Sequence, residues 1–525
     1  MCPHQHYRWL YDFSYVVFVF HFVSILSLLS TRNILKMTVN VVELSNEILD
    51  LISDRSRNRH PHHFKDDIPS TVGVTPKRTP IALMGGMPNY QFFPIADIDI
   101  KLRTKPFDDN KIVDFKVPII NDGTSATLDV RTALQYSDSI GLAPLRDQIH
   151  QFVERVVRPA YNGWDVITTL GGSDGILKTF DLLVDPGDVI LFEEFTFTPV
   201  LNMLKEKGGI AVPITLKSLF PKETTLEAEF DYYDEIENLL SNWKTLKPDL
   251  KFPKALYTIP NGHNPLGVSQ SLEHKKKIYN LAEKYNFIII EDEPYSYLNY
   301  TPYSEDVDNN LTNDDYIKSL RPSFETFDIS ARVIRIETLS KIFAPGMRLG
   351  FIVAHKDFVK YYGNLSECTT KSPNGYSQII LNNAIIAYGG VEGWIHWITQ
   401  VRNEYLKRKN AFVRALINTD AYKKGLISPI DPACGMFVSV IVNVEKHKDF
   451  VDSDESYRDL MNKFFLKGYE NGVTFVLGQA MSVKYSFSAS RSNFVRASIS
   501  YVADESVLED AAQRFSDAAL EFFDT

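Results

Sequence analysis

Cysteine is scarce in this chain of 525 residues. There are only three, Cys2, Cys368 and Cys434, and they lie far apart in the sequence. An odd number of scattered cysteines excludes a disulfide framework, and it offers no Cys-x-x-Cys pair to hold a metal ion. We therefore expect a protein of a reducing compartment, and the predicted location is cytoplasmic.

Surplus positive charge is also missing. Lysine and arginine number 56 against 66 aspartates and glutamates, which gives a formal net charge of -10. A chain of this charge is poorly suited to the phosphate backbone, so a nucleic-acid-binding function is not expected. With 44% hydrophobic and 23% charged residues, the composition excludes collagen, coiled-coil and wholly disordered chains.

An apolar run, VVFVFHFVSILSLL, occurs near the N-terminus at residues 16–29. It is too short to establish a bilayer span, and signal-peptide cores and buried segments also have this length. Few positive charges precede it and no A-x-A cleavage pattern is present, which argues against a secretory signal. The alternatives stay open: a signal or anchor, a buried segment, or an upstream extension before a start at Met37. Membrane contact is expected only if residues 16–29 are an anchor.

The next segment, residues 53–80, is polar and rich in basic residues, histidine and proline, which is typical of a solvated arm. His60, His62 and His63 cluster in it. A flexible tract without carboxylate or cysteine support is expected to be inert, so no metal site is predicted. We predict a hydrophobic extension at residues 1–36 and an arm or linker at residues 37–80.

Between about residues 164 and 350 the pattern changes. Short apolar runs such as DVITTL, DVILFE, KALYTI, FIIIED and RVIRIETL alternate with amphipathic segments such as LEHKKKIYNLAEKY. Such runs are typical of buried parallel strands, and the alternation indicates βα units around a central, mostly parallel sheet. In sheets of this kind, ligands bind at the carboxyl ends of the strands.

The predicted fold class is therefore α/β, with a large domain and a smaller α+β domain. The large domain is expected at residues 81–362, and it includes an acidic polar insertion at 303–327 that is interpreted as a surface loop. Helical stretches, an alternating strand at 435–444 and a mixed tail indicate the small domain at residues 363–525.

Five motifs follow the predicted strands, and the first is GGSDG at residues 171–175. Amides at a helix N-terminus and a serine hydroxyl bind phosphate, although a plain glycine-rich turn has the same appearance. The spacing is not that of a GxGxxG dinucleotide site. The second motif, EEFTF at 193–197, offers aromatic faces that could stack on a planar ring or belong to an ordinary core.

The third motif is PNGHNPLG at residues 260–267, and the fourth is EDEPY at 291–295. The third places an asparagine amide at a strand end, where it can hydrogen-bond a phenolate oxygen. The fourth places a carboxylate at the buried end of a strand, where it needs a cation such as a protonated pyridine nitrogen. A helix cap is the alternative interpretation of the fourth motif.

The fifth motif is TLSKIFAPGMRLG at residues 338–350. A lysine among desolvating groups can form an imine with an aldehyde, and hydroxyls with a nearby arginine can hold a dianionic phosphate. Taken alone, an exposed loop lysine is the better explanation of this motif. Together the five motifs supply what a pyridoxal phosphate site requires: a phosphate cradle, a ring stack, a pyridinium partner, a phenolate partner and a reactive lysine.

In these motifs the chain resembles the fold-type I pyridoxal-phosphate aminotransferases. Within them it is similar to the kynurenine/2-aminoadipate aminotransferases and the fungal aromatic amino-acid aminotransferases of type II. The resemblance spans roughly residues 80–525, and it is carried by GGMPN (85–89), EEFTFTP (193–199), EDEPY (291–295) and ETLSKIFAPGMRLGF (337–351). It implies a large domain with a mostly parallel central sheet and pyridoxal 5'-phosphate as the cofactor.

The resemblance also implies a role for each matching residue. Lys341 would bond the cofactor covalently and act as general base and acid between Cα and C4′. Asp292 would pair with the pyridine nitrogen, and Tyr295 would bind the ring oxygen together with Asn264. Phe197 would stack on the ring. The implied phosphate ligands are Ser173, Asp174, Thr338, Ser340 and Arg348.

Further implied roles concern the substrate and a second subunit. Arg496 would grip the substrate α-carboxylate bidentately, and Asn264 would lie beside the substrate. Gly85 and Gly86 would belong to a substrate-side loop in which glycine permits close backbone approach. Tyr136 would cross a dimer interface to the neighbour's phosphate, so a homodimer is implied.

Two positions depart from the family pattern. Asp174 stands where asparagine or glutamine is more usual, and a carboxylate beside a phosphate would repel it unless it points away. Leu266 replaces a more frequent threonine, which should be tolerable because Asn264 makes the hydrogen bond.

The implied activity is transamination of aromatic L-amino acids with a 2-oxo acid acceptor, with 2-aminoadipate and kynurenine as further candidate donors. A carbon–sulfur lyase with the same cofactor is the nearest alternative, because the pocket decides which Cα bond breaks. A transcription regulator built on this fold would need an N-terminal winged helix, which the residues before Gly85 do not indicate.

Overall fold

The structure is a computed structural model, and it describes residues 42–62, 66–81, 83–121, 126–217, 230–305 and 310–524. All of them belong to one compact unit. The apolar run at 16–29, Met37 and His63 lie outside the described residues. Within the described ranges, no helix combines the length and the apolar character needed to cross a bilayer.

A seven-stranded sheet forms the centre of the fold, in the order β3-β9-β8-β7-β6-β4-β5. From β8 to β5 neighbouring strands run parallel, whereas β9 is antiparallel to both β3 and β8. The predicted α/β class with a mostly parallel sheet is confirmed. The strands are β3 (Trp164–Thr169), β4 (Val189–Glu193), β5 (Ile210–Ile214), β6 (Pro253–Thr258), β7 (Ile288–Asp292), β8 (Val333–Thr338) and β9 (Gly350–His355).

Helices cover both faces of this sheet. Successive residues of a strand point to opposite faces, and in these strands the residues on both faces are apolar. In β7, Ile288 and Ile290 pack on one face, whereas Ile289 packs on the other. The period of two places Asp292 on the face of Ile290. On that face lie α5 (Gly172–Leu183), α6 (Pro199–Glu206) and α11 (Lys356–Cys368), and on the other lie α4 (Ala143–Val156), α7 (Tyr233–Ser241), α9 (Leu272–Tyr285) and α12 (Gly375–Ala387).

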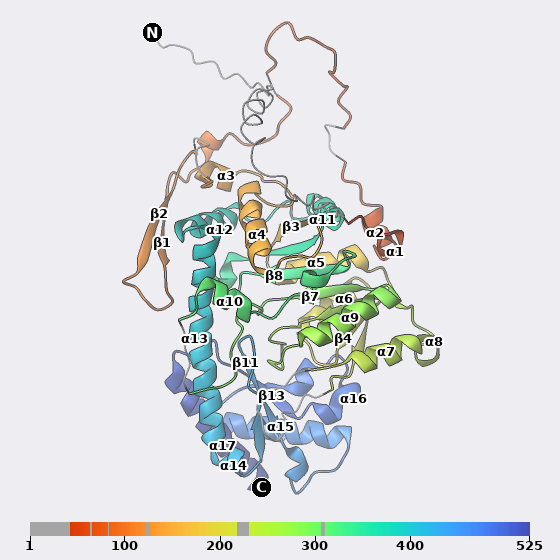
Figure 1. The fold of residues 1–525 in the computed structure, drawn as a ribbon, viewed down its shortest axis with the longest axis vertical. Coiled ribbons are helices and arrows are strands. Elements are labelled where there is room, and N and C mark those ends of the chain that lie inside the picture. Colours follow the sequence, from red (N-terminus) through yellow and green to blue (C-terminus); the bar gives the residue numbers. More distant parts are fainter. Residues whose placement is uncertain are drawn as a thin grey trace, which may run out of the picture. The chain divides into compact units, whose positions relative to one another are not determined.

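A four-stranded antiparallel sheet follows nearer the C-terminus, in the order β10-β11-β13-β12. The 29-residue helix α13 (Gly390–Asn418) contacts α4 and α12 beside the large sheet and β10 and α17 beside the small one, as Figure 1 shows. The elements of this region are β10 (Ile427–Pro429), β11 (Phe437–Val442), β12 (Val476–Leu477), β13 (Phe494–Ser498), α14 (Asp420–Lys423), α15 (Asp454–Glu470), α16 (Tyr485–Ser488) and α17 (Glu505–Asp524).

The remaining elements are short. An antiparallel hairpin joins β1 (Ile98–Arg103) and β2 (Ile112–Val117). The predicted domain boundary after residue 362 falls inside α11, and the division into two domains stays a prediction. The other short helices and 3-10 turns are α3 (Val130–Leu134), α8 (Trp243–Leu246), η1 (Tyr90–Phe92), η2 (Phe324–Phe327), η3 (Pro345–Met347), η4 (Val444–Lys446), η5 (Gly478–Met481) and η6 (Ala489–Arg491).

Part of the segment expected to be an arm packs against the large sheet. It forms α1 (Asn46–Leu49) and α2 (Asp54–Arg57), and Ile52 is fully buried in the core that contains α5. The Ser53 hydroxyl donates a hydrogen bond to the Asp181 carbonyl at 2.8 Å. Residues 66–81, in contrast, are exposed throughout the described positions.

The prediction of a surface loop at 303–327 is wrong for its second half. There α10 (Asn313–Ser319) and η2 form, and Tyr316 and Phe324 are buried in the core. Two of the acidic residues that suggested a loop, Asp314 and Asp315, follow the N-cap Thr312 and occupy the first turn of α10. Negative side chains stabilise that end of a helix, so they mark a helix start here.

An ion pair between a buried glutamate and a partly exposed arginine ties the end of β4 to the C-terminal region. Glu194 is fully buried, and its Oε2 lies 2.6 Å from Arg491 Nη2. Without the arginine, the carboxylate would remain buried without a counter-ion.

We expect Arg491→Ala to lower the free energy of unfolding by about 3 kcal/mol, measured by urea denaturation. The matched control is Arg414→Ala, whose partner Glu509 is 46% exposed and which is itself 49% exposed. That change should cost less than about 1 kcal/mol, because exposed pairs contribute little. Equal losses in the two variants would contradict this assignment.

Candidate active site

A cavity of about 220 Å³ opens beyond the carboxyl ends of β6, β7 and β8, with the N-terminus of α5 in its wall. All five sequence motifs contribute to it, although they are spread from residue 171 to residue 350 of the chain. The predicted residues that line this cavity are Ser173, Phe197, Asn264, Asp292, Tyr295, Thr338, Ser340, Lys341 and Arg348.

One end of the cavity is built to receive an anion. Helix α5 starts at Gly172, and the N–H groups of a first helical turn have no partner within the helix. Together with the helix dipole, they favour negative charge. Gly171 has a φ of 97°, and a Cβ there would lie 2.6 Å from Arg348 Nη2. Glycine therefore lets the guanidinium lie against the turn, beside the hydroxyls of Thr338 and Ser340, which are 2.8 Å apart.

Asp174 is not among the residues that line the cavity. Its Oδ2 accepts hydrogen bonds from the Leu170 N–H at 2.9 Å and from Lys178 Nζ at 2.8 Å. The carboxylate is thus held by its own helix and the preceding turn. Only the backbone of Asp174 is left to face an anion at the helix N-terminus.

Asp292 ends β7, and its side chain is 6% exposed. Burial raises the pKa of its carboxyl to about 7; a hydrogen bond from Tyr257 acts in the opposite direction, and the negative charge of Glu337 adds to the rise. The Tyr257 hydroxyl donates to Asp292 Oδ2 at 2.5 Å. A buried carboxylate gains most from a cation, so Asp292 makes this wall of the cavity selective for a positively charged group.

Asn264, Tyr295 and Arg496 meet beside Asp292. Arg496 Nη1 donates to Asn264 Oδ1 at 2.7 Å, and the guanidinium carbon lies 4.3 Å from the centre of the Phe437 ring. Arg496 Nε is buried and has no hydrogen-bond partner among the described residues. Burial lowers the pKa of Arg496 and raises that of Tyr295. A guanidinium has five N–H donors, so Arg496 can serve Asn264 and still bind a carboxylate.

Lys341 lies at the junction of two cavities. Burial lowers the pKa of its amine, and the positive charges of Arg348 and Arg496 lower it further. A lysine in such surroundings is deprotonated more readily and becomes a nucleophile or base. Lys341 also lines a neighbouring cavity of about 330 Å³, whose aromatic walls are Phe107, Phe343, Trp397 and Tyr405.

Four predicted residues do not line the cavity: Asp174 and Arg496, whose contacts are given above, and Tyr136 and Gly86. The side chain of Tyr136 is 70% exposed, and Gly86 has no described atom within 4 Å of where its Cβ would lie. Their assigned roles stay predictions.

Sequence reasoning missed several residues of the site. Tyr257 stands inside the apolar run KALYTI, where a tyrosine is typical of core, and the parity of the strands would have placed its hydroxyl on the face of Asp292. Tyr257 lies behind Asp292 and does not line the cavity, whereas the unpredicted residues that do line it are Gly172, Ile176, Ile259, Pro294 and Pro345.

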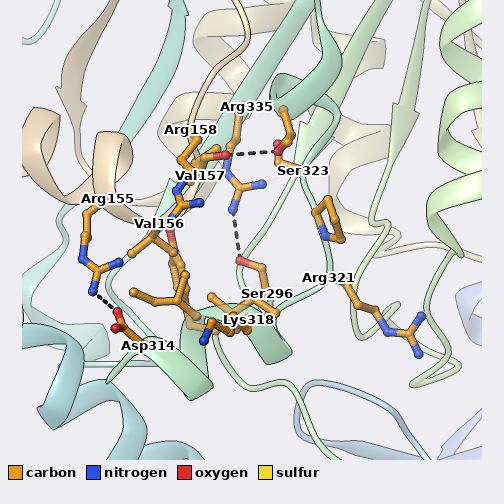
Figure 2. A pocket seen from close by; sticks show the side chains of 15 residues that line it. Arg155, Val156, Val157, Arg158, Ser296, Asp314, Lys318, Arg321, Ser323 and Arg335 are labelled. Carbon is orange, nitrogen blue, oxygen red and sulfur yellow. Dashed lines mark hydrogen bonds and ion pairs between the residues drawn. The ribbon is translucent and has the colours of Figure 1, made fainter. Parts of the chain in front are cut away.

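A further cavity, of about 290 Å³, lies on the opposite face of β8. Figure 2 shows Arg335 directed at Ser296 in it and Arg155 paired with Asp314. Its cationic lining suggests an anion site, but Arg335 is already neutralised by the buried carboxylates of Glu291, Glu293 and Glu337. The first cavity is therefore the candidate active site.

Comparison with known proteins identifies the family of this chain. The sequence profile of the family "Aminotransferase class I and II" matches residues 107–514. The chain belongs to this family. The predicted family and the prediction of an enzyme are thereby confirmed.

Several relatives of this aminotransferase cover nearly the whole chain. Aromatic amino acid aminotransferase 2 of Saccharomyces cerevisiae is 36% identical over 93% of this chain and 98% of its own length. The crystal structure of the aromatic aminotransferase Aro9 from Candida albicans has a TM-score of 0.83 at 38% identity, and it covers 91% of this chain and 98% of its own. Aro8 from the same organism has a TM-score of 0.81 at 27% identity, covering 92% and 100%.

Asp292 makes the stability of the ligand-free aminotransferase depend on pH. Its pKa rises from 3.8 to about 7 on folding, so the folded state binds more protons between these values. The stabilisation is complete below about pH 4 and is lost as the pH rises through about 7.

Asp292→Asn removes this titration but keeps an acceptor for Tyr257. We expect the stability of the variant relative to the wild type to grow by about 2–3 kcal/mol between pH 5 and pH 8, measured by urea denaturation at each pH. The exposed control Asp459→Asn should show a constant difference. If the free energies of unfolding of the wild type and of Asp292→Asn changed in parallel with pH, the raised pKa of Asp292 would be contradicted.

Proposed function

We propose that this aminotransferase uses pyridoxal 5'-phosphate and takes the amino group from aromatic L-amino acids to a 2-oxo acid. The observation that carries the proposal is the convergence of Lys341, Asp292 and the anion cradle on one cavity. Neither the neighbouring cavity of about 330 Å³ nor the one of about 290 Å³ on the opposite face of β8 has Asp292 and Lys341 together in its walls.

The residues fit this cofactor at each of its polar groups. The cradle at α5 with Arg348, Thr338 and Ser340 supplies donors for a phosphate. Asp292 would hold the protonated ring nitrogen, and Tyr295 with Asn264 would bind the ring oxygen. Phe197 supplies an aromatic face for stacking. When bound, the cofactor supplies an electron-withdrawing ring that stabilises negative charge at the substrate Cα.

The chain's own residues account for the other steps. Arg496 binds the substrate α-carboxylate with guanidinium donors beyond the one that serves Asn264, and this fixes the orientation of Cα. Lys341, with its lowered pKa, accepts the proton from Cα and returns it later as an acid. A 2-oxo acid carries the same α-carboxylate, so Arg496 serves both halves of the ping-pong reaction.

Two observations support aromatic substrates. The relatives named above include an enzyme called aromatic amino acid aminotransferase 2 and the structure of an aromatic aminotransferase. The cavity next to Lys341 has phenylalanine, tryptophan and tyrosine side chains in its walls. Such walls suit the side chains of phenylalanine, tyrosine and tryptophan. The proposal includes 2-aminoadipate and kynurenine as further donors to be assayed.

The proposal also includes a homodimer in the cytoplasm. Tyr136 is a large aromatic side chain left exposed in one chain, which suits a role across a subunit interface. The scattered cysteines support a reducing compartment.

The first test concerns Lys341. Addition of pyridoxal phosphate should produce the absorption band of a lysine-bound cofactor in the wild type and in the control Lys318→Ala, but not in Lys341→Ala. Phenylalanine alone should then bleach the band and release phenylpyruvate. A band that phenylalanine leaves unchanged would contradict the aromatic substrate, and release of ammonia and pyruvate from cysteine conjugates would favour the lyase alternative.

The second test concerns Arg496. Arg496→Lys keeps the charge but loses the planar pair of donors, so KM should rise by roughly tenfold to a hundredfold for both phenylalanine and 2-oxoglutarate. The affinity for pyridoxal phosphate should stay the same in equilibrium dialysis. A rise in KM for only one of the two substrates would contradict a shared carboxylate site.

A further inference from the structure

Asp292 receives its hydrogen bond from a residue outside the five motifs. Tyr257 lies on β6 beside β7, and its hydroxyl donates to Asp292 Oδ2 at 2.5 Å. Within the described part of the chain, this is the only hydrogen bond made to the Asp292 carboxylate. One carboxylate oxygen is thereby fixed, and Asp292 itself lines the cavity.

The Tyr257 ring is itself immobilised. It is fully buried, and its centre lies 5.1 Å from that of Phe192 and 6.5 Å from that of Phe180. Packing on these rings prevents the side chain from turning away from Asp292. Burial also raises the pKa of Tyr257, so its hydroxyl keeps the proton that it donates.

This hydrogen bond opposes the other influences on Asp292. Burial raises the pKa of the carboxyl, and the charges of Glu337 and Glu193 do the same, whereas the bond from Tyr257 lowers it. Without the hydroxyl, Asp292 would hold its proton to a higher pH and would offer less negative charge to a cation.

We propose that Tyr257 is the positioning residue of this site: its hydroxyl orients Asp292 and keeps it ionised for the ring nitrogen of the cofactor. The inference rests on the proposed function, because it requires pyridoxal phosphate in the cavity. Tyr257 does not itself line the cavity, so its effect passes through Asp292.

The test is Tyr257→Phe, which removes the hydroxyl and keeps the ring. The matched control is Tyr362→Phe, because Tyr362 is equally buried in the same core and its hydroxyl bonds Thr179 at 2.9 Å. We expect Tyr257→Phe to weaken pyridoxal phosphate binding by at least about tenfold at neutral pH in equilibrium dialysis. Its loss of affinity on acidification should begin at a higher pH than in the wild type. In the control Tyr362→Phe, neither the affinity for pyridoxal phosphate nor the pH at which it falls should change.

A second probe separates positioning from folding. An analogue with carbon in place of the pyridine nitrogen cannot use Asp292, so the wild type and Tyr257→Phe should bind it with equal affinity. An equal loss of affinity for cofactor and analogue would show a merely structural role and overturn the inference, as would unchanged cofactor binding. If the wild type itself does not bind pyridoxal phosphate, the proposed function fails first, and the two failures are thus distinguishable.

Discussion

A carboxylate buried at the end of β7 is the constraint on which this site depends. Three isoleucines and Glu291 precede Asp292 in β7, and the whole strand is buried. The carboxyl of Asp292 is therefore ionised only with help from neighbours. The fold supplies that help in two ways: a hydrogen bond from Tyr257 and a position in the wall of a cavity that a cation can enter. Arg348, Lys341 and Arg496 make the remainder of the site positive. The cavity therefore suits a molecule with an anionic end and a cationic ring nitrogen.

The opposite face of the same strand ends carries a second buried charge network. Arg335 pairs there with Glu291, Glu293 and Glu337, and Asn261 donates to Glu293 Oε1 at 2.5 Å. Along their strands, these residues alternate with Asp292 and Ile336, which point to the opposite face. The face with Arg335 fixes the strand ends, and the face with Asp292 presents the reactive groups. Removal of Arg335 would take away the cation that these three buried carboxylates share, which couples the geometry of the site to the integrity of this network.

The sequence was sufficient for the parts of the site that combine a polar side chain with a strand end. Lys341, Asp292 and Asn264 could be found because each interrupts or follows an apolar run, and parallel strands bring such positions to one edge. Tyr257 could not, because a tyrosine within an apolar strand is equally typical of core. The second half of the 303–327 insertion was misinterpreted because acidic residues are frequent in loops and in the first turn of helices alike. Those distinctions depend on which strand or helix a residue meets, and local composition does not contain that information.

The departure at Asp174 shows how a change unfavourable in isolation is accommodated. An acidic side chain near a phosphate cradle would repel the anion, but this one is bonded by the Leu170 N–H and by Lys178 one helical turn later. Lys178 is nearly buried, and its amine cancels the charge of Asp174 within a single ion pair. A negative group in the first turn of α5 also interacts favourably with the helix dipole. Asp174 and Lys178 together have no net charge, as does the asparagine or glutamine that is more usual at position 174. The effect of residue 174 therefore depends on residue 178.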